Sequence, residues 1–419
     1  MPNVRTALQR GLEYEIWIML ALTGVSFLST QMLPVAAFVG IVFWGLNQWA
    51  TRPERPTWAD GAILILLLML PITCWATGDL TTTQVQVYRL LNGIGLYYSL
   101  LHWANSPSRL QWMVLGLIGA GVLLALYASV SVEWAPSKIP FFPTALYERF
   151  VLLVGDTVHR NVLGGALVLI FPLPLSLGLF APGKPSKALF TGILVAGLVI
   201  LAMLILTQSR GALMAFFFAA LVVCALRWKW VGWGLLGIGL AGGIFLGFYG
   251  FGNALIHLTS GGALDELPGR FETWHRAGYM IQDFPFTGIG MGTFGPVAEK
   301  LYPFILQEPG SVPHAHNLFL QVAVDLGIPG FVAWMTILIS TVGVAWKIYW
   351  TGKHKQDHWL SGMGAGLFAS QIALIMHGLF DAVTWGMVRP APLVWAIWGL
   401  VVAYGRINGS SEPDPPSAV

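Results

Sequence analysis

The sequence has little charge for its length: 10% of its 419 residues are Asp, Glu, Lys or Arg, whereas 56% are hydrophobic. This balance lies far outside that of soluble globular domains and excludes an ordinary water-soluble enzyme. Cysteine is scarce as well, because Cys74 and Cys224 are the only two, and both lie inside apolar runs. They indicate no disulfide framework. We expect no cleavable signal peptide, since no short apolar segment with a small-residue cleavage site follows Arg5 and Arg10.

What the sequence does have is a series of apolar runs long enough to cross a bilayer, which takes about 17–25 residues. Many of its 19 tryptophans lie near the ends of these runs, as in an interfacial aromatic belt. We predict an all-α polytopic membrane protein with about 12 transmembrane helices. The tenth is expected to break near Gly327, Pro329 and Gly330. The predicted spans are residues 16–30, 32–50, 61–78, 87–104, 110–131, 161–181, 188–207, 211–226, 231–251, 317–349, 359–383 and 390–406.

The basic residues predict how these spans are oriented. With the N-terminus in the cytoplasm, 13 of the 22 Lys and Arg residues fall on the inner face, and every cytoplasmic loop carries at least one. This is the bias that the positive-inside rule describes, so both termini are predicted inside. The layout divides the chain into spans 1–9 within residues 1–251, one large extracytoplasmic loop at 252–316, spans 10–12 within 317–406, and a disordered cytoplasmic tail at 407–419.

Arginines on the outer face are exceptions to this rule. Arg210 lies in the short turn "TQSRG" between two apolar spans, together with Gln208 and Ser209. An arginine so close to the hydrocarbon is costly and indicates a functional site. Its planar guanidinium suits bidentate binding of a phosphate. The alternative is an arginine that only reaches up to headgroup phosphates.

A second outer group lies in the segment "GRFETWHRAGYMIQD" of the large loop. Helical spacing places Arg270 and Trp274 on one face, whereas Arg276 lies off that face.

The same loop continues with "GIGMGTFG", which formally matches a dinucleotide-binding fingerprint at Gly290, Gly292 and Gly295. No buried strand precedes the match and no βαβ unit surrounds it, so we reject that interpretation. We predict a glycine-rich turn that lets the backbone approach a neighbouring segment.

The motif "PHAHN" places His314 and His316 directly before Asn317 and a long apolar run. Histidines at i and i+2 do not share a helical face, and no Cys or carboxylate cluster accompanies them, so we expect no metal site. We predict that one histidine works as a base or hydrogen-bond donor while its neighbour orients it. A structural hydrogen bond is the alternative.

Two further polar groups lie on the outer side of the layout. His159, Arg160 and Asn161 precede the sixth span, where a helix cap by Asn161 or Asp156 is the alternative to a binding role. Near the outer end of the eleventh span, "HGLFDAVTWGMVRP" carries His377, Asp381 and Arg389, and pairing of Asp381 with an outer arginine is expected if it is buried.

The segments "LTQSRGALMAFFFA", "GRFETWHRA…GIGMGTF" and "HAHNLFLQVAVDLGIPGF", in this order and spacing, resemble the O-antigen ligase and O-antigen polymerase superfamily. The resemblance implies a membrane glycosyltransferase of the GT-C type in the bacterial cytoplasmic (inner) membrane. Such enzymes move a glycan from an undecaprenyl-pyrophosphate carrier to an acceptor hydroxyl on the extracytoplasmic face. Ligases use a lipopolysaccharide precursor, lipid A-core, as acceptor, and polymerases use another lipid-linked repeat unit; the sequence leaves this choice open.

The resemblance also implies roles for particular residues. It assigns catalysis to Arg210, Arg270 and His316, and arginines suit the negative charge that develops on a pyrophosphate leaving group. We expect metal-independent, inverting transfer with no cofactor. The expected partners are a lipid-linked glycan donor, a lipid- or glycan-linked acceptor and membrane lipids, with no nucleic acid. The candidate substrate-binding residues are Arg89, Arg160, His159, Asn161, Gln208, Ser209, Trp274, Arg276, His314, Asn317, Asp381 and Arg389.

Two other classes of protein remain as alternatives. A membrane transporter or transport-associated protein, of the bicarbonate-uptake kind, would also have many spans and buried polar residues. A transporter, however, places its charges near the bilayer midplane, whereas these cluster toward one surface. A scaffold without chemistry would leave the arginines and histidines without a role.

Overall fold

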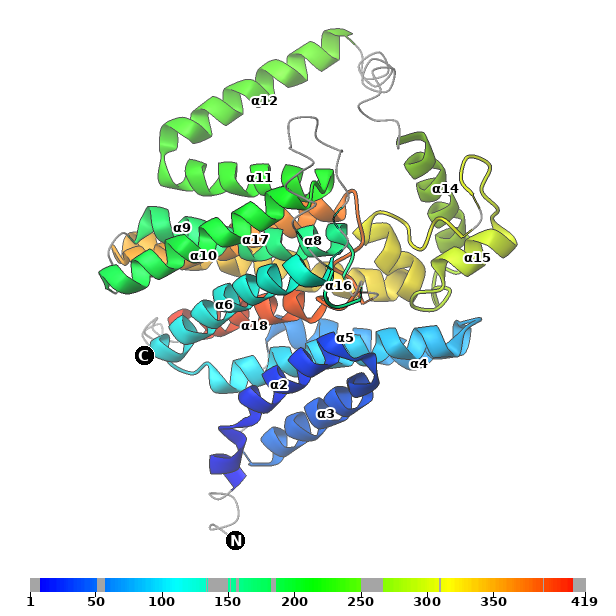
Figure 1. Ribbon diagram of the computed structural model, residues 1–419, viewed down its shortest axis with the longest axis horizontal. Helices are drawn as coiled ribbons and strands as arrows, with labels where there is room; N and C mark the ends of the chain where they lie inside the picture. The colour runs from blue at the N-terminus through cyan, green and yellow to red at the C-terminus, as the bar shows by residue number, and fades with distance from the viewer. Residues whose placement is uncertain are drawn as a thin grey trace, which may run out of the picture.

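The computed structural model describes residues 8–50, 57–132, 134, 150, 152–155, 158–181, 186–249, 267–308, 310–386 and 388–409. Its regular elements are helices, most of them gathered in one bundle (Figure 1). They are α2 (Glu15–Leu28), η1 (Thr30–Met32), α3 (Leu33–Ala50), α4 (Trp58–Ala76), α5 (Leu80–Trp103), α6 (Pro107–Ser131), α8 (Arg160–Ile170), α9 (Pro172–Phe180), α10 (Lys187–Leu206), α11 (Arg210–Arg227), α12 (Lys229–Tyr249), α14 (Leu267–Asp283), α15 (Phe294–Leu301), α16 (Leu318–His354), α17 (His358–Gly378) and α18 (Pro392–Gly409).

The helices confirm an all-α polytopic membrane protein. Among the described residues, nine helical segments are long and apolar enough to cross a membrane, and α8 and α9 together form one of them. Helices α5, α12 and α18 occupy the positions of the remaining predicted spans. In α5 the apolar run is interrupted by Gln86, Arg89 and Asn92, which are all buried. The total of 12 spans stays a prediction.

Helices α16 and α17 form the centre of the bundle. Helix α17 packs against α16, α9 and α11, while α5 packs against α18 on the other side of the core (Figure 1). Glycines permit the closest approaches, as at helix crossings in membranes generally. A Cβ on Gly364 of α17 would lie 2.2 Å from the Tyr349 nitrogen of α16, and one on Gly93 would lie 2.4 Å from Trp395.

Helix α16 breaks at Gly327, as the sequence predicts. The backbone there has φ 68° and ψ −178°, and a Cβ would lie 2.8 Å from the Pro285 carbonyl oxygen. The Ile328 amide donates to that same oxygen at 2.7 Å. The chain that leads into the glycine-rich turn therefore packs against the break in α16. Only glycine fits the backbone conformation of Gly327 without strain.

The glycine-rich turn is held inside the bundle rather than at its surface. Gly290 has φ 101°, and a Cβ on it would lie 2.5 Å from the Thr77 side chain. The Met291 amide donates to Thr73 Oγ1 at 3.0 Å, and the Gly292 amide donates to Asp325 Oδ1 at 3.2 Å. The prediction of a close backbone approach is confirmed.

Helices α14 and α15, which belong to the predicted extracytoplasmic loop, lie together at one end of the bundle. Helix α18 ends toward the opposite side (Figure 1). One boundary changes, because α18 continues to Gly409 and so enters the predicted tail at 407–419. Residues 410–419 of that tail lie outside the described residues. The assignment of the α14–α15 end to the outer face stays a prediction.

Candidate functional site

The "PHAHN" motif forms an irregular turn that ends in a well-capped helix. Asn317 is the N-cap of α16, since its Oδ1 accepts hydrogen bonds from the Phe319 and Leu320 amides, each at 3.0 Å. Its Nδ2 donates to the Leu379 carbonyl oxygen at 3.1 Å. Asn317 therefore fixes the two histidines before it against the chain that leaves α17.

Both ring nitrogens of His314 face partners. The His316 amide donates to His314 Nδ1 at 3.1 Å, while His314 Nε2 lies 3.7 Å from Asp381 Oδ1. This arrangement places the ring proton on Nε2, toward the carboxylate. Burial lowers the pKa of His314 below its ordinary value, although the Asp381 carboxylate acts in the opposite direction. His314 is thus held in one orientation between these two partners.

His316 is placed differently, in a strained backbone conformation. Its φ is 48°, it is half-buried, and its ring lies 4.2 Å from that of His314, centroid to centroid. Gln208, in the "TQSRG" turn, has the same φ of 48°. Non-glycine residues seldom adopt this conformation, and such strain concentrates at functional sites. Two of the predicted motifs therefore carry a strained residue.

The two motif arginines lie on helices that meet the same short segment after α17. Arg270 of α14 donates from Nη1 to the Phe380 carbonyl oxygen. Arg210 is the exposed first residue of α11. The next residue, Gly211, packs beside this segment, since a Cβ there would lie 3.8 Å from His377 and 3.9 Å from the Phe380 side chain. The structure thus brings these elements of distant motifs to one place.

The rest of the "TQSRG" turn is buried against the start of α8. Gln208 and Ser209 are 1% and 5% exposed, and a Cβ on Gly164 of α8 would lie 3.1 Å from the Ser209 Cβ. This packing explains how a polar turn is held between two apolar helices.

The group before the sixth span is a helix cap, but not the one expected. His159 is the N-cap of α8, with its Nδ1 accepting from the Asn161 amide at 3.2 Å. Asp156, the other expected cap, lies outside the described residues. Arg160 is the half-buried first residue of the helix. His159 also lies close enough to His314 for their charges to interact, so this cap borders the site.

The prediction that no carboxylate accompanies the histidine pair is wrong. The pair does not lie on a regular helix, and Asp381, distant in sequence, supplies a carboxylate. One ligand atom each from His314, His316 and Asp381 lies within 4.8 Å of the others, so the three could hold a metal ion. Metal independence itself stays a prediction.

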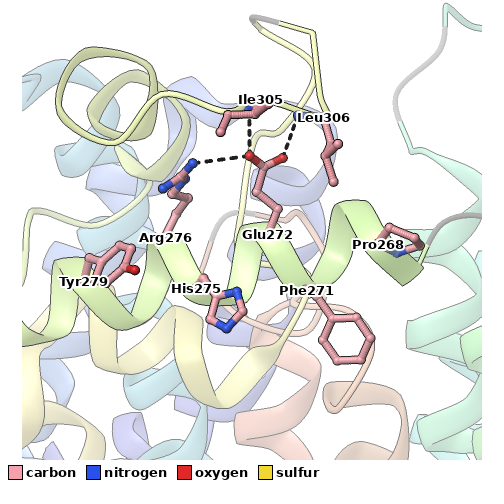
Figure 2. A pocket seen from close by; sticks show the side chains of 8 residues that line it. All are labelled: Pro268, Phe271, Glu272, His275, Arg276, Tyr279, Ile305 and Leu306. Carbon is pink, nitrogen blue, oxygen red and sulfur yellow. Dashed lines mark hydrogen bonds and ion pairs between the residues drawn. The ribbon is translucent and has the colours of Figure 1, made fainter. Parts of the chain in front are cut away.

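Arg276 lies on a different face of α14 from Arg270. Figure 2 shows Arg276 and Glu272 reaching toward the chain at Ile305 and Leu306, around a hollow of about 430 Å³. Glu272 accepts from the Ile305 and Leu306 amides at 2.6 and 2.9 Å and pairs with Arg276 at 3.3 Å. Burial by itself raises the pKa of Glu272, but these amides and Arg276 outweigh it and hold the pKa below its ordinary value.

Trp274 lies on the expected face, next to Thr273 and Ala277, which are fully buried. Its indole nitrogen is buried, and its ring packs edge-on against Phe271 at 5.4 Å. This ring contact lies within α14, and no contact printed for the described part of the chain ties Trp274 to the histidines.

Arg89 and Arg389 are brought together by the structure, but around another part of the chain. Arg89 of α5 is 6% exposed and donates from Nη1 to the Gly386 carbonyl oxygen at 2.7 Å. Arg389 donates from Nη1 to the Phe27 carbonyl oxygen of α2 at 3.2 Å. Arg389 belongs to the far end of the segment that begins with Asp381, and Arg89 contacts that segment at Gly386.

Two buried polar residues are absent from the predicted site. His377 is fully buried, and neither of its ring nitrogens has a hydrogen-bond partner among the described residues. Asp325 is 1% exposed and accepts from Gln321 Nε2, the Gly292 amide and Trp385 Nε1. The signal for Asp325 was a lone carboxylate inside an apolar run, which is costly in a membrane.

Comparison with known families gives a match over part of the chain. Residues 195–335 match the family model described as O-antigen ligase. The matched region contains Arg210, Arg270 and His316, and it confirms the resemblance to the O-antigen ligase and polymerase superfamily. It supports a membrane glycosyltransferase of this general kind. A search of curated proteins gave no match.

Proposed function

We propose that this protein transfers a glycan from an undecaprenyl-pyrophosphate carrier to an acceptor hydroxyl, at the bundle end that carries α14 and α15. The observation that supports this best is the convergence of three distant motifs on the segment after α17. Arg270 reaches Phe380, Gly211 packs beside it, and His314 faces Asp381. The expected active-site face is extracytoplasmic, in the bacterial inner membrane.

The arginines would act on the leaving group. As the bond between the anomeric carbon and the pyrophosphate oxygen breaks, the pyrophosphate keeps the electron pair and gains negative charge. Guanidinium groups of Arg210 and Arg270 placed beside it would stabilise that charge, and stabilisation of this kind usually lowers the barrier more than any other single effect. Their planar donor geometry suits phosphate oxygens.

His316 would act on the acceptor. The acceptor oxygen forms the new bond to the anomeric carbon, and its proton moves to the imidazole, from which water removes it later. His316 is the better base of the pair, because His314 already accepts the His316 amide on Nδ1 and directs Nε2 to Asp381. His314 and Asp381 would then orient His316. Attack opposite the leaving group would invert the anomeric centre.

Buried carboxylates are the observation that would favour a transporter, and their surroundings argue against it. Asp325 is hydrogen-bonded by three protein donors. Glu15 of α2 is 2% exposed and lies within hydrogen-bond distance of Asn47 and Ser99. In both cases the protein itself satisfies the carboxylate oxygens, as expected of a residue that holds neighbouring segments together.

The test is a reaction of the purified protein with a polyprenyl-pyrophosphate glycan and two acceptors, lipid A-core and a second lipid-linked repeat unit. Mass spectrometry should find a product equal in mass to acceptor plus glycan, and the acceptor that reacts would distinguish ligase from polymerase. Arg210→Ala, with Arg10→Ala as an exposed control, should lose the product. Bicarbonate accumulation in proteoliposomes, with no glycan transfer to either acceptor, would contradict the proposal.

A further inference from the structure

Arg89 and Arg389 form a pair of like charges with no counter-ion in the described part of the chain. Each donates to one backbone carbonyl, of Gly386 and Phe27 respectively, and neither forms an ion pair with a described carboxylate. Arg389 lies three residues after Gly386, whose carbonyl oxygen accepts from Arg89. A buried, uncompensated positive charge is costly, so the structure needs an anion here that the described residues do not provide.

Buried polar groups without a described partner lie one helical turn after Arg89 and next to Phe27, whose carbonyl oxygen accepts from Arg389. Gln86, Arg89 and Asn92 follow each other at three-residue steps on one face of α5. Asn92 Oδ1 accepts from Thr23 Oγ1 of α2 at 3.1 Å, which leaves Asn92 Nδ2 buried without a described partner. Ser26 Oγ, one helical turn after Thr23, is buried without a described partner as well. Such groups are rare in native proteins and call for a bound partner.

We propose that Arg89, Arg389, Asn92 and Ser26 form a second anion site, which binds the phosphate of a membrane lipid headgroup. Two guanidiniums, an amide N–H and a hydroxyl are all donors, and a phosphate supplies several acceptor oxygens at once. The site lies between the end of α2, the first half of α5 and the segment before α18. It goes beyond the proposed function, because it needs no glycan and no transfer.

This site lies on the same segment as the candidate catalytic residues. Asp381 is at the start of the chain between α17 and α18, and Gly386 and Arg389 are near its end. Between them, Trp385 donates to Asp325 of α16 at 2.8 Å. A bound phosphate would therefore fix a segment whose other end faces His314, and phosphate binding should raise the thermal stability of the whole protein.

The experiment compares three probes on the purified full-length protein in detergent: phosphatidylglycerol, diacylglycerol with the same acyl chains, and inorganic phosphate. Binding is read by native mass spectrometry and by the shift in thermal midpoint. We expect phosphatidylglycerol to bind and stabilise, and diacylglycerol to do neither. Inorganic phosphate that competes with the lipid supports the same chemistry, and binding of inorganic phosphate as tight as that of the lipid would make free phosphate the natural occupant.

Matched variants locate the site. Arg389→Gln should weaken phosphatidylglycerol binding by about tenfold or more, because charged hydrogen bonds are lost. Arg10→Gln removes one charge from an exposed arginine and should change nothing. Equal binding of diacylglycerol, or undiminished lipid binding by Arg389→Gln, would overturn the proposal.

Asn92→Asp gives a test that does not depend on losing an arginine. The aspartate keeps the acceptor for Thr23 and places a carboxylate one helical turn from Arg89, within the site proposed for the phosphate. The variant should therefore melt at a higher temperature without lipid and bind phosphatidylglycerol about tenfold more weakly. A variant that binds the lipid like wild type would show that Asn92 and the arginines do not share a ligand.

Discussion

At the scale of single residues, the two histidines of "PHAHN" are not equivalent. Both ring nitrogens of His314 have partners: Nδ1 accepts from the His316 amide, and Nε2 faces Asp381. His316 is half-buried and strained at φ 48°. The strain must be maintained by its surroundings, among them the Asn317 cap that bonds Leu379. This difference supports the proposal that His316 accepts the proton and that His314 positions it.

The first prediction follows from that assignment. His316→Ala should lower glycan transfer by about 10²–10⁴-fold, the usual contribution of a general base, while donor binding stays near normal. His314→Ala should be milder. The measurements are donor affinity and product formation in the same preparations. Near-normal transfer by His316→Ala, or loss of donor binding as complete as in Arg210→Ala, would make the base assignment wrong.

The second prediction concerns the arginine pair of the site. Arg210→Lys and Arg270→Lys keep the charge but lose the planar donor fork, so transfer should fall about 10²-fold in a folded protein. Arg10→Lys is the exposed control and should behave as wild type. Steady-state product formation checks this. Unchanged turnover in Arg210→Lys would show that this residue is only an anchor to lipid headgroups.

At the scale of elements, the glycine-rich turn and the break in α16 hold each other in place. A Cβ on Gly288 would lie 2.5 Å from the Asp325 carbonyl oxygen, and one on Gly327 would lie 2.8 Å from the Pro285 oxygen. The third prediction is that Gly290→Ala, with φ 101° and Thr77 at 2.5 Å, destabilises the protein by at least about 2 kcal/mol. The thermal midpoint in detergent measures this.

Gly278→Ala is the matched control for that substitution. Gly278 lies inside α14, and a Cβ there would meet nothing within 4 Å. Alanine should therefore stabilise the helix by about 0.5–1 kcal/mol. Equal melting of the two variants would show that the turn tolerates a side chain and does not need the tight fit described here.

The fourth prediction concerns the cluster formed by the turn before α16 and the chain after α17. Transfer should survive a strong chelator, because arginines supply the positive charge that a metal would otherwise provide. This test distinguishes the two mechanisms, because the geometry of His314, His316 and Asp381 could hold a metal ion. Loss of activity with EDTA, restored by one divalent metal, would replace the base mechanism with metal-assisted transfer.

The same elements show how far sequence reasoning reaches. The break at Gly327 follows from local chemistry, since glycine and proline interrupt a helix wherever they occur. The approach of Asp381 to His314 does not, because it depends on how α16 packs against α17, and no local pattern encodes that contact. Arg276 was likewise grouped with the site by proximity in sequence, although helical spacing alone places it on another face of α14.

At the scale of the whole molecule, the proposed function depends on which side of the membrane the cluster faces. The α14–α15 end and the C-terminal end of α18 lie at opposite sides of the bundle (Figure 1). Single cysteines at Gly310 and Gln356, with Cys74 and Cys224 replaced by Ala, should react with impermeant reagents from opposite faces. This labelling fixes the orientation of the vesicles used in the decisive assay.

Glycan transfer on the outer face is the central claim, and transfer in sided membrane vesicles tests it most directly. The vesicles contain the lipid-linked donor, and a membrane-impermeant acceptor is added outside. We expect product from right-side-out vesicles, little from inverted ones until they are permeabilised, and none from His316→Ala in either. Product from intact inverted vesicles alone, or product from His316→Ala at the wild-type rate, would contradict the claim.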